Sequence, residues 1–371
     1  MITHFSVKNF RCFRDWSHFD LRTQKRYEFN PESIVGTTIK NAVLYGENGQ
    51  GKTNIGLAMM DVIYHLSQKH ISIYKSESSF LNIYSGDSLA EFCLCFDFNG
   101  AEVIYEYGKN EKEKVVYENL RIDGDLILSL DKKQSMTAII NLNGAETLNK
   151  VITENIPSVV SYVRNNVAKE DSRVHQVFWK FCQFVDGMAF VGSRDIVREF
   201  FGPIPQDYES LDEAIIYKYG VSTLETFLTE MGITMKLTTM ESEKGKTLGI
   251  QGLRRTIPFF SNISSGTRSL TILFLWIQRI KHEQLSFIFF DEFDAHYHHA
   301  LARDMMRALF ATQAQVVITS HNTSVISTEL LRPDCYFQVN DYQPKPFYKF
   351  TERELREAHN MEKMYRAGVF S

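Results

Sequence analysis

The chain has 371 residues, of which 44% are hydrophobic, 13% aromatic and 23% charged. This is the composition of a folded globular protein, and it excludes collagen-like and disordered classes. The 41 basic and 45 acidic residues give a formal net charge of -4, so no overall positive charge favours nucleic acid as a partner. The length predicts about two domains, or one domain with a large insertion.

The cysteines and the apolar segments indicate the compartment. The chain has an odd number of scattered cysteines, which fits reduced thiols better than a disulfide framework. They are Cys12, Cys93, Cys95, Cys182 and Cys335. The first residues form no apolar signal segment, and no stretch reaches the roughly 18 apolar residues that a membrane helix needs. We therefore expect a cytoplasmic protein without a membrane partner.

The first predicted elements lead into a glycine-rich loop. Residues 2–13 carry a mixed alternation that is typical of a β-strand. A short apolar run at 41–45 is followed by the loop GENGQG at 46–51, and residues 55–66 then show the apolar spacing of a helix. The chain therefore presents a strand, a loop and a helix in that order.

The middle of the chain changes from strands to helices. Residues 91–107 alternate around the turn Asn99-Gly100 and predict a β-hairpin, which 115–120 and 126–130 extend into a meander. The segment from about 145 to 235 carries longer periodic stretches, and residues 174–185 have the spacing of an amphipathic helix. We therefore expect a β meander followed by a mostly helical block.

The C-terminal third alternates between helices and strands. After a loop-rich return at 245–252, helices are predicted at 266–279 and 299–310, and buried strands at 287–290 and 316–319. Such alternation is typical of an α/β sheet with parallel strands. A further helix is predicted within 352–365.

The loop at 46–53 matches the phosphate-loop pattern G-x-x-x-x-G-K-[ST] between a predicted strand and a predicted helix. Its glycines let backbone N–H groups turn toward phosphates, while Lys52 would reach the β and γ phosphates and the Thr53 hydroxyl would ligate Mg²⁺. The residues predicted to bind ATP here are Gly46, Asn48, Gly49, Gly51, Lys52, Thr53 and Asn54. We therefore expect ATP and Mg²⁺ as cofactors.

Two carboxylates follow the predicted strand 287–290. Asp291 and Glu292 would stand at the carboxyl edge of the sheet, beside the phosphate loop. Asp291 would hold Mg²⁺, directly or through water, so Thr53 and Asp291 are the predicted metal ligands. Glu292 would orient or deprotonate the attacking water, because transfer of the γ-phosphoryl group to water needs a proton acceptor.

The two motifs predict a nucleotide hydrolase, and here the sequence resembles the ATP-binding-cassette (ABC) branch, in particular the RecF, SMC and OLD-like ATPases. Residues 264–268 (SSGTR) stand where that family carries its signature motif, and 319–322 (TSHN) where it carries its switch histidine. Residues 7–13 look like the family's opening strand. The resemblance covers the first 65 or so residues and those from about 250 onward.

The resemblance implies the fold and its division. We expect an α/β, ABC-type P-loop NTPase with a mixed sheet, an antiparallel β meander and an inserted, mostly helical subdomain. Residues 1–145 would form the N-terminal part of the ATPase domain, 146–245 the helical insertion, and 246–371 the C-terminal part of the ATPase domain.

The resemblance also implies that two subunits stack head to tail and share composite sites. Ser264, Ser265 and Gly266 would then bind the γ-phosphate held by the other subunit, although alone they would be read as a helix N-cap. His321 would contact the γ-phosphate and couple it to closure, or could be a satisfied histidine at a strand end. Residues 294–299 would form the loop to the opposite subunit; a zinc site at its histidines is the less favoured alternative.

The ending at 362–368 resembles that of small stand-alone ATPases in bacterial anti-phage and abortive-infection systems. It implies a slow ATPase that assembles on ATP as a homodimer or larger homo-oligomer and regulates a separate effector, a nuclease. One alternative is a RecF-like repair ATPase that binds DNA. Its candidate basic residues are Lys8, Arg11, Arg14, Arg22, Lys25 and Arg26. The other alternative is a nucleotide-gated scaffold with little turnover.

Overall fold

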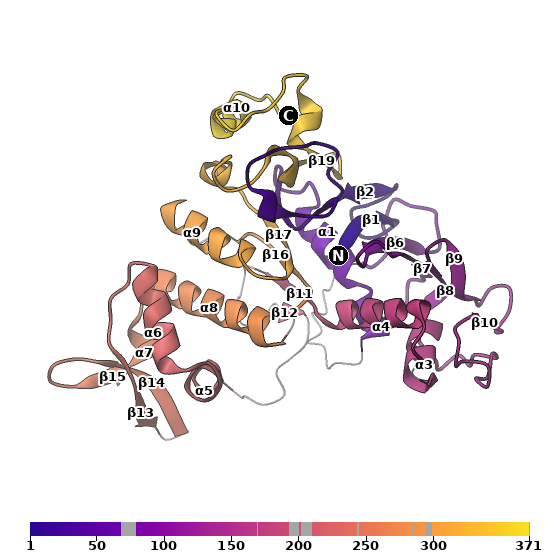
Figure 1. Ribbon diagram of the computed structural model, residues 1–371, viewed down its shortest axis with the longest axis horizontal. Helices are drawn as coiled ribbons and strands as arrows, with labels where there is room; N and C mark the ends of the chain where they lie inside the picture. Colours follow the sequence, from indigo (N-terminus) through magenta and orange to yellow (C-terminus); the bar gives the residue numbers. More distant parts are fainter. Residues whose placement is uncertain are drawn as a thin grey trace.

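The computed structural model describes residues 1–67, 79–168, 170–192, 200–201, 210–242, 245–283, 285–293 and 299–370. Two seven-stranded sheets dominate these residues, with a smaller three-stranded sheet and a two-stranded ribbon. Figure 1 shows a central sheet flanked by α8 and α9 on one side, and an antiparallel sheet with α3 and α4 on the other.

The central sheet carries the phosphate loop. Its order is β12-β11-β16-β17-β5-β18-β19, with parallel inner strands and antiparallel strands at both edges. The strands are β5 (Asn41–Tyr45), β11 (Met188–Val191), β12 (Phe200–Phe201), β16 (Phe287–Phe290), β17 (Gln315–Thr319), β18 (Tyr336–Asn340) and β19 (Gln343–Pro346). The predicted strands 41–45, 287–290 and 316–319 are confirmed. Because β5, β16 and β17 run parallel, the residues after them meet at one edge.

The antiparallel sheet is the predicted meander. Its order is β10-β9-β8-β7-β6-β1-β2. The strands are β1 (Ile2–Lys8), β2 (Ser17–Asp20), β6 (Ala90–Asp97), β7 (Glu102–Lys109), β8 (Val115–Ile122), β9 (Asp125–Asp131) and β10 (Ile139–Ile140). In the turn between β6 and β7, Asn99 has φ 58° and Gly100 φ 85°. Both lie in the left-handed region that a two-residue hairpin turn requires, so the sequence signal at this turn is confirmed.

Helices cover the sheets and build a separate lobe, and no described helix is long and apolar enough to cross a membrane. They are α1 (Lys52–Met60), α2 (Ile63–Leu66), α3 (Val159–Asn166), α4 (Arg173–Asp186), α5 (Leu211–Glu213), α6 (Val221–Glu230), α7 (Phe259–Asn262), α8 (Ser265–Glu283), α9 (His299–Phe310) and α10 (Met361–Arg366). Shorter helical turns are η1 (Pro31–Ser33), the π-helical η2 (Ala214–Tyr219), η3 (Thr323–Val325), η4 (Pro333–Cys335) and η5 (Phe347–Phe350).

The lobe at the lower left of Figure 1 combines α5, α6 and α7 with the three-stranded sheet. That sheet consists of β13 (Leu237–Ser242), β14 (Gly245–Gln251) and β15 (Thr256–Pro258). The two-stranded ribbon consists of β3 (Ile34–Val35) and β4 (Thr38–Ile39). The lobe leads directly into α8, so it carries the predicted signature segment.

Three predictions differ from the structure. The loop-rich return at 245–252 is mostly strand β14, because pairing with β13 and β15 decides the conformation. The block 146–245, predicted to be a mostly helical insertion, also contributes β11 and β12 to the central sheet. The helix expected within 352–365 begins only at Met361, where the side chain of Asn360 accepts a hydrogen bond from Lys363 N (2.9 Å).

Helix α1 lies directly against the central sheet. A Cβ atom added to Gly56 would lie 2.5 Å from ring carbons of Phe289 and 2.8 Å from the ring of Phe190. Only glycine therefore lets the helix approach β11 and β16 this closely. The helix that follows the phosphate loop thus rests on the strand that precedes Asp291.

A buried polar cluster, called here the inner cluster, joins α1–α2 to the antiparallel sheet. Its members are Asp61, His65, Tyr105, Tyr107, Lys109 and Glu118. Lys109 Nζ lies 2.7 Å from Asp61 Oδ2, with side-chain exposures of 2% and 5%. Tyr107 also donates to Asp61 (2.9 Å). Glu118 accepts hydrogen bonds from Tyr105, Ser158 and Val159 N (2.7, 2.7 and 2.5 Å). Every carboxylate here therefore has donors, as burial requires.

Candidate nucleotide-binding site

The phosphate loop follows β5 and ends at α1. Gly46, Gly49 and Gly51 have φ values of 152°, 85° and 89°, which side chains rarely adopt. A Cβ atom at Gly46 would also lie 2.8 Å from Val339 O, and one at Gly51 would lie 3.0 Å from Cys12 Sγ. At Gly46 and Gly51 both the backbone conformation and the neighbouring residues therefore require glycine.

Lys52 is the first residue of α1, and its side chain turns back under the loop. Its ammonium donates to Gly46 O (2.7 Å) and to Glu47 O (3.0 Å). Burial lowers the pKa of Lys52, while the carboxylates of Asp291 and Glu292 act in the opposite direction. The loop therefore holds a cation that lacks an ion-pair partner within hydrogen-bond distance in the described residues, as a phosphate site requires.

Asp291 lies between two hydroxyl groups. Thr53 Oγ1 donates to Asp291 Oδ2 (2.7 Å) and Thr319 Oγ1 to Asp291 Oδ1 (2.8 Å). Burial raises the pKa of Asp291, and the two hydroxyl donors oppose that rise. A threonine hydroxyl beside a carboxylate is an oxygen donor set of the kind that Mg²⁺ prefers, so the predicted ligands fit the metal.

Glu292 is held in an unusual backbone conformation. Its φ is 48°, in the left-handed region that non-glycine residues seldom adopt. Glu292 N donates to Thr319 Oγ1 (2.7 Å), and Phe293 N donates to Thr319 O (3.1 Å). Thr319 therefore organises both acids. The sequence analysis named Thr319 only within the segment that contains His321. Its position as a hydroxyl residue at the end of the next parallel strand could have indicated this role.

The remaining predicted site residues near the phosphate loop are Asn54, Asn48 and His321. Asn54 contacts the N-terminal segment, since its Nδ2 donates to Cys12 Sγ (3.2 Å) and it accepts from Arg11 (3.5 Å). Asn48 is exposed in the loop. His321 is exposed and follows β17 at the same sheet edge as Asp291. The hydrogen bond from Ser320 N to Leu44 O (3.1 Å) ties this segment to the end of β5, the strand that precedes the phosphate loop. The structure therefore brings the phosphate loop, the two acids and His321 to one edge.

The predicted signature segment lies elsewhere. Ser264 Oγ accepts a hydrogen bond from Thr267 N (3.1 Å), which is the geometry of an N-cap on α8. In Figure 1 the start of α8 lies beside α7 in the lower-left lobe, apart from α1. Ser264, Ser265 and Gly266 are thus not part of the same chain's phosphate site. Of the predicted loop to the opposite subunit, 294–299, residues 294–298 lie outside the described residues.

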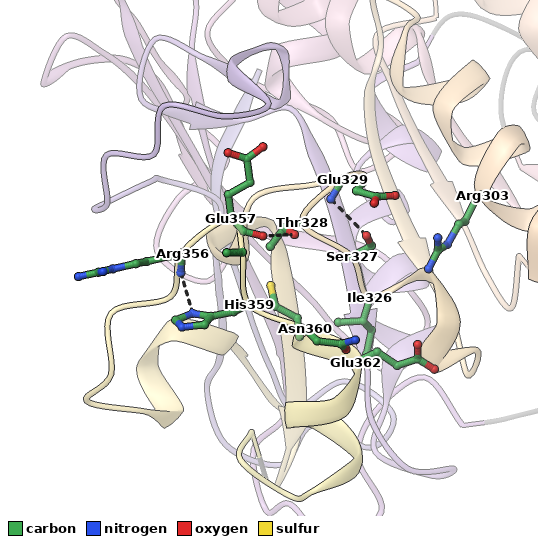
Figure 2. A pocket seen from close by; sticks show the side chains of 12 residues that line it. Arg303, Ile326, Ser327, Thr328, Glu329, Arg356, Glu357, His359, Asn360 and Glu362 are labelled. Carbon is green, nitrogen blue, oxygen red and sulfur yellow. Dashed lines mark hydrogen bonds between the residues drawn. The ribbon is translucent and has the colours of Figure 1, made fainter.

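A cavity of about 720 Å³ lies between α9, the segment after His321 and the C-terminal segment (Figure 2). Arg303 of α9 donates to Ser324 O through Nε and Nη2 (2.9 and 2.6 Å). Thr328 Oγ1 donates to Glu357 O (2.7 Å). Acidic and basic side chains are mixed around it, so the lining indicates no single class of ligand.

Comparisons with known proteins agree with this geometry. Residues 157–327, just under half of the chain, match the family described as "AAA domain, putative AbiEii toxin, Type IV TA system". The matched segment contains Asp291, Glu292 and His321 but not the phosphate loop. A search of curated proteins found no significant match.

Two solved structures are distantly similar. The SMC head domain from Thermotoga maritima has 16% sequence identity and a TM-score of 0.46, and the match covers 93% of this chain and 98% of that one. The Smc head domain with an extended coiled coil, bound to the C-terminal domain of ScpA from Pyrococcus furiosus, has 12% identity and a TM-score of 0.44, with 99% of both chains covered. The chain thus combines a phosphate-loop pattern and a parallel sheet of the ABC/SMC-like P-loop fold with a segment, 157–327, that is similar to the family named above.

Proposed function

We propose that the chain binds ATP and Mg²⁺, hydrolyses ATP slowly, and assembles on ATP into a homodimer or larger homo-oligomer. In this proposal it regulates a separate effector protein, a nuclease, in anti-phage defence. The hydrogen bonds that connect Thr53, Asp291, Thr319 and Glu292 carry the ATPase part. The description of the matching family as a toxin of a toxin–antitoxin system supports the defence part.

The chemistry follows from the contacts of three side chains. Lys52 would exchange the carbonyl oxygens of Gly46 and Glu47 for phosphate oxygens, which are stronger acceptors. Thr53 and Asp291 would hold Mg²⁺, which neutralises phosphate charge when bound. Glu292, with its left-handed backbone, supplies a second carboxylate at the end of the same strand as Asp291. This carboxylate would accept the proton of the attacking water.

The position of the signature segment supports assembly. Residues 264–266 offer hydroxyl and N–H groups at the start of α8, a 19-residue helix whose dipole favours an anion there. Because this helix start is remote from the phosphate loop of its own chain, a γ-phosphate could bridge both only between two copies. ATP would then act as the bridge that holds the subunits together.

Two of the six basic residues named for the DNA-repair alternative, Lys8 and Arg22, lie beside acidic side chains. Lys8 lies 2.7 Å from Asp87 and 3.5 Å from Glu91, and Arg22 lies 2.8 Å from Asp20. Acidic neighbours therefore compensate these two charges, whereas a phosphate-binding face needs free cations.

The test combines assembly and turnover in one set of samples. Light scattering after gel filtration would be recorded for the wild type, Glu292→Gln and Lys52→Ala, each with and without Mg-ATP, and phosphate release would be measured alongside. We expect ATP to increase the mass of the wild type and of Glu292→Gln but not of Lys52→Ala. Only the wild type should release phosphate.

Two results would change the proposal. If ATP increased the mass while wild type and Glu292→Gln released phosphate at the same negligible rate, the chain would be a nucleotide-gated scaffold. If neither mass nor phosphate responded to ATP, only the fold would remain. The effector part needs a separate experiment, in which phage protection by the chain with its neighbouring genes is lost on Lys52→Ala.

A further inference from the structure

The turn between β18 and β19 has an unexpected composition. Asp341 and Tyr342 have φ values of 47° and 62°, so both central residues of this two-residue turn are left-handed. Such turns strongly prefer Asn-Gly, because glycine carries no side chain to clash with its own backbone. A bulky residue in the second position is strained, and strain of this kind persists mainly where the side chain has a function.

Neighbouring residues keep the strained turn in place. Ser17 Oγ donates to Tyr342 O (2.5 Å), and Gln343 Nε2 donates to Trp16 O (2.7 Å). The side chain of Gln343 also accepts a hydrogen bond from His18 N (3.1 Å). These three hydrogen bonds from residues 16–18 hold the turn, and so hold the backbone from which the Tyr342 side chain projects.

The ring of Tyr342 lies beside the phosphate loop. A Cβ atom at Gly51, the residue before Lys52, would lie 3.2 Å from Tyr342 Cδ1. The ring also packs edge-on against buried Phe13, with centroids 6.2 Å apart and an interplanar angle of 81°. Yet 40% of Tyr342 is exposed, which is more than a residue serving only the core would leave.

We propose that Tyr342 is the stacking platform for the base of the nucleotide whose phosphates bind at residues 46–53. The inference rests on the nucleotide binding proposed above and adds the subsite for a planar heteroaromatic base. An aromatic ring attracts the face of any base, so the platform supplies affinity without choosing between adenine and guanine. It also explains why a strained tyrosine stands where glycine would be more stable.

The decisive variant is Tyr342→Gly, because it removes the ring and relieves the strain together. Calorimetric titration in a Glu292→Gln background would compare Mg-ATP with Mg-tripolyphosphate, which has phosphates but no base. We expect Tyr342→Gly to weaken ATP binding by about 5- to 150-fold, the range of base–aromatic stacking, and to leave tripolyphosphate binding unchanged. Its thermal midpoint should equal or exceed that of the parent.

Matched variants separate the ring from the turn. Tyr342→Phe keeps the stacking face and should bind ATP like the parent. Asp341→Gly relieves strain at the neighbouring position and should raise stability without changing ATP binding. The proposal is overturned if Tyr342→Gly binds ATP like the parent, or if it loses ATP and tripolyphosphate equally.

The failure of the proposed function has a different signature. Lys52→Ala should weaken ATP and tripolyphosphate alike, because both probes use the phosphate loop. If the parent bound neither probe, nucleotide binding itself would be refuted, and the platform with it. If Lys52→Ala lost both probes while Tyr342→Gly lost neither, only the platform would be refuted.

Discussion

The nucleotide site and the inner cluster both place lysine and carboxylate side chains inside the fold, but these charged groups have different partners in the two regions. In the inner cluster, Lys109 and Asp61 form a direct ion pair with almost no exposure. At the nucleotide site, Lys52 binds backbone carbonyls, and within the part of the chain that the structure describes Asp291 accepts hydrogen bonds from two hydroxyl groups. Removal of one partner from a buried ion pair destabilises the fold, whereas charged groups at a sheet edge without an ion-pair partner are suited to bind a ligand.

The contrast predicts that the two regions respond to mutation in opposite ways. Changes at the sheet edge should affect chemistry and leave the fold intact. Changes in the inner cluster should destabilise the fold, because no ligand or solvent can replace a lost partner.

The largest effect is expected at Glu292. Glu292→Gln removes the proton acceptor, so phosphate release should fall by about 100- to 10,000-fold, the usual range for a general base. Its thermal midpoint should remain that of the wild type. Glu354→Gln, at a carboxylate that is 74% exposed, is the matched control and should change neither quantity. Full phosphate release by Glu292→Gln would assign the base elsewhere.

The next largest effect is expected at Lys109. Lys109→Met leaves the charge of Asp61 buried without its partner, which should reduce the free energy of unfolding by about 3–5 kcal/mol. Urea denaturation followed by circular dichroism measures this loss. The double variant Lys109→Met with Asp61→Asn should recover part of it, because no unpaired charge remains. A loss below about 1 kcal/mol in the single variant would show that the pair is solvated.

A smaller, pH-dependent effect is expected from His65. Burial, with a contribution from Lys109, holds the pKa of His65 well below its ordinary value, so the folded protein keeps this side chain neutral. The unfolded chain binds a proton below about pH 6.5, so acid favours unfolding. The free energy of unfolding should fall by at most about 1.4 kcal/mol per pH unit through this group.

The measurement compares wild type with His65→Gln by urea denaturation at about pH 7.5 and about pH 5.5. The wild type should lose more stability than the variant between these values. Equal losses would mean that His65 is protonated in the folded state or titrates in both states alike.

The smallest effect is expected at the surface. Arg356 and Glu354 form an ion pair at 2.9 Å, but their side chains are 72% and 74% exposed. Arg356→Ala should therefore change the free energy of unfolding by less than about 0.5 kcal/mol. A larger loss would point to the backbone contact with His359 that shapes the neighbouring cavity (Figure 2).

Sequence reasoning found the residues whose pattern is local. The phosphate loop lies within eight consecutive residues, and the two glycines that its pattern requires, Gly46 and Gly51, occupy positive-φ positions. Asp291 and Glu292 were found because a buried strand ends at them. The structure places these residues at one edge with His321, as the parallel order of β5, β16 and β17 requires.

Residues whose role depends on distant contacts were missed. Thr319 acts across 28 positions on Asp291, and Tyr342 meets Phe13 and Gly51 from the far end of the chain. Lys109 meets Asp61 only because the meander folds back over α1. The segment 245–252 is predicted to be a loop, because its glycines weaken a strand signal, but pairing with the neighbouring strands makes most of it strand β14. No single window of sequence contains such partners.

Gly56 has a mechanical consequence. Because α1 touches the rings of Phe289 and Phe190 without intervening side chains, the helix cannot rock on the sheet without a steric clash. A tilt of α1 toward the sheet would press its backbone at Gly56 into these rings. We therefore expect α1 and the strands β11 and β16 to move together as one stiff unit.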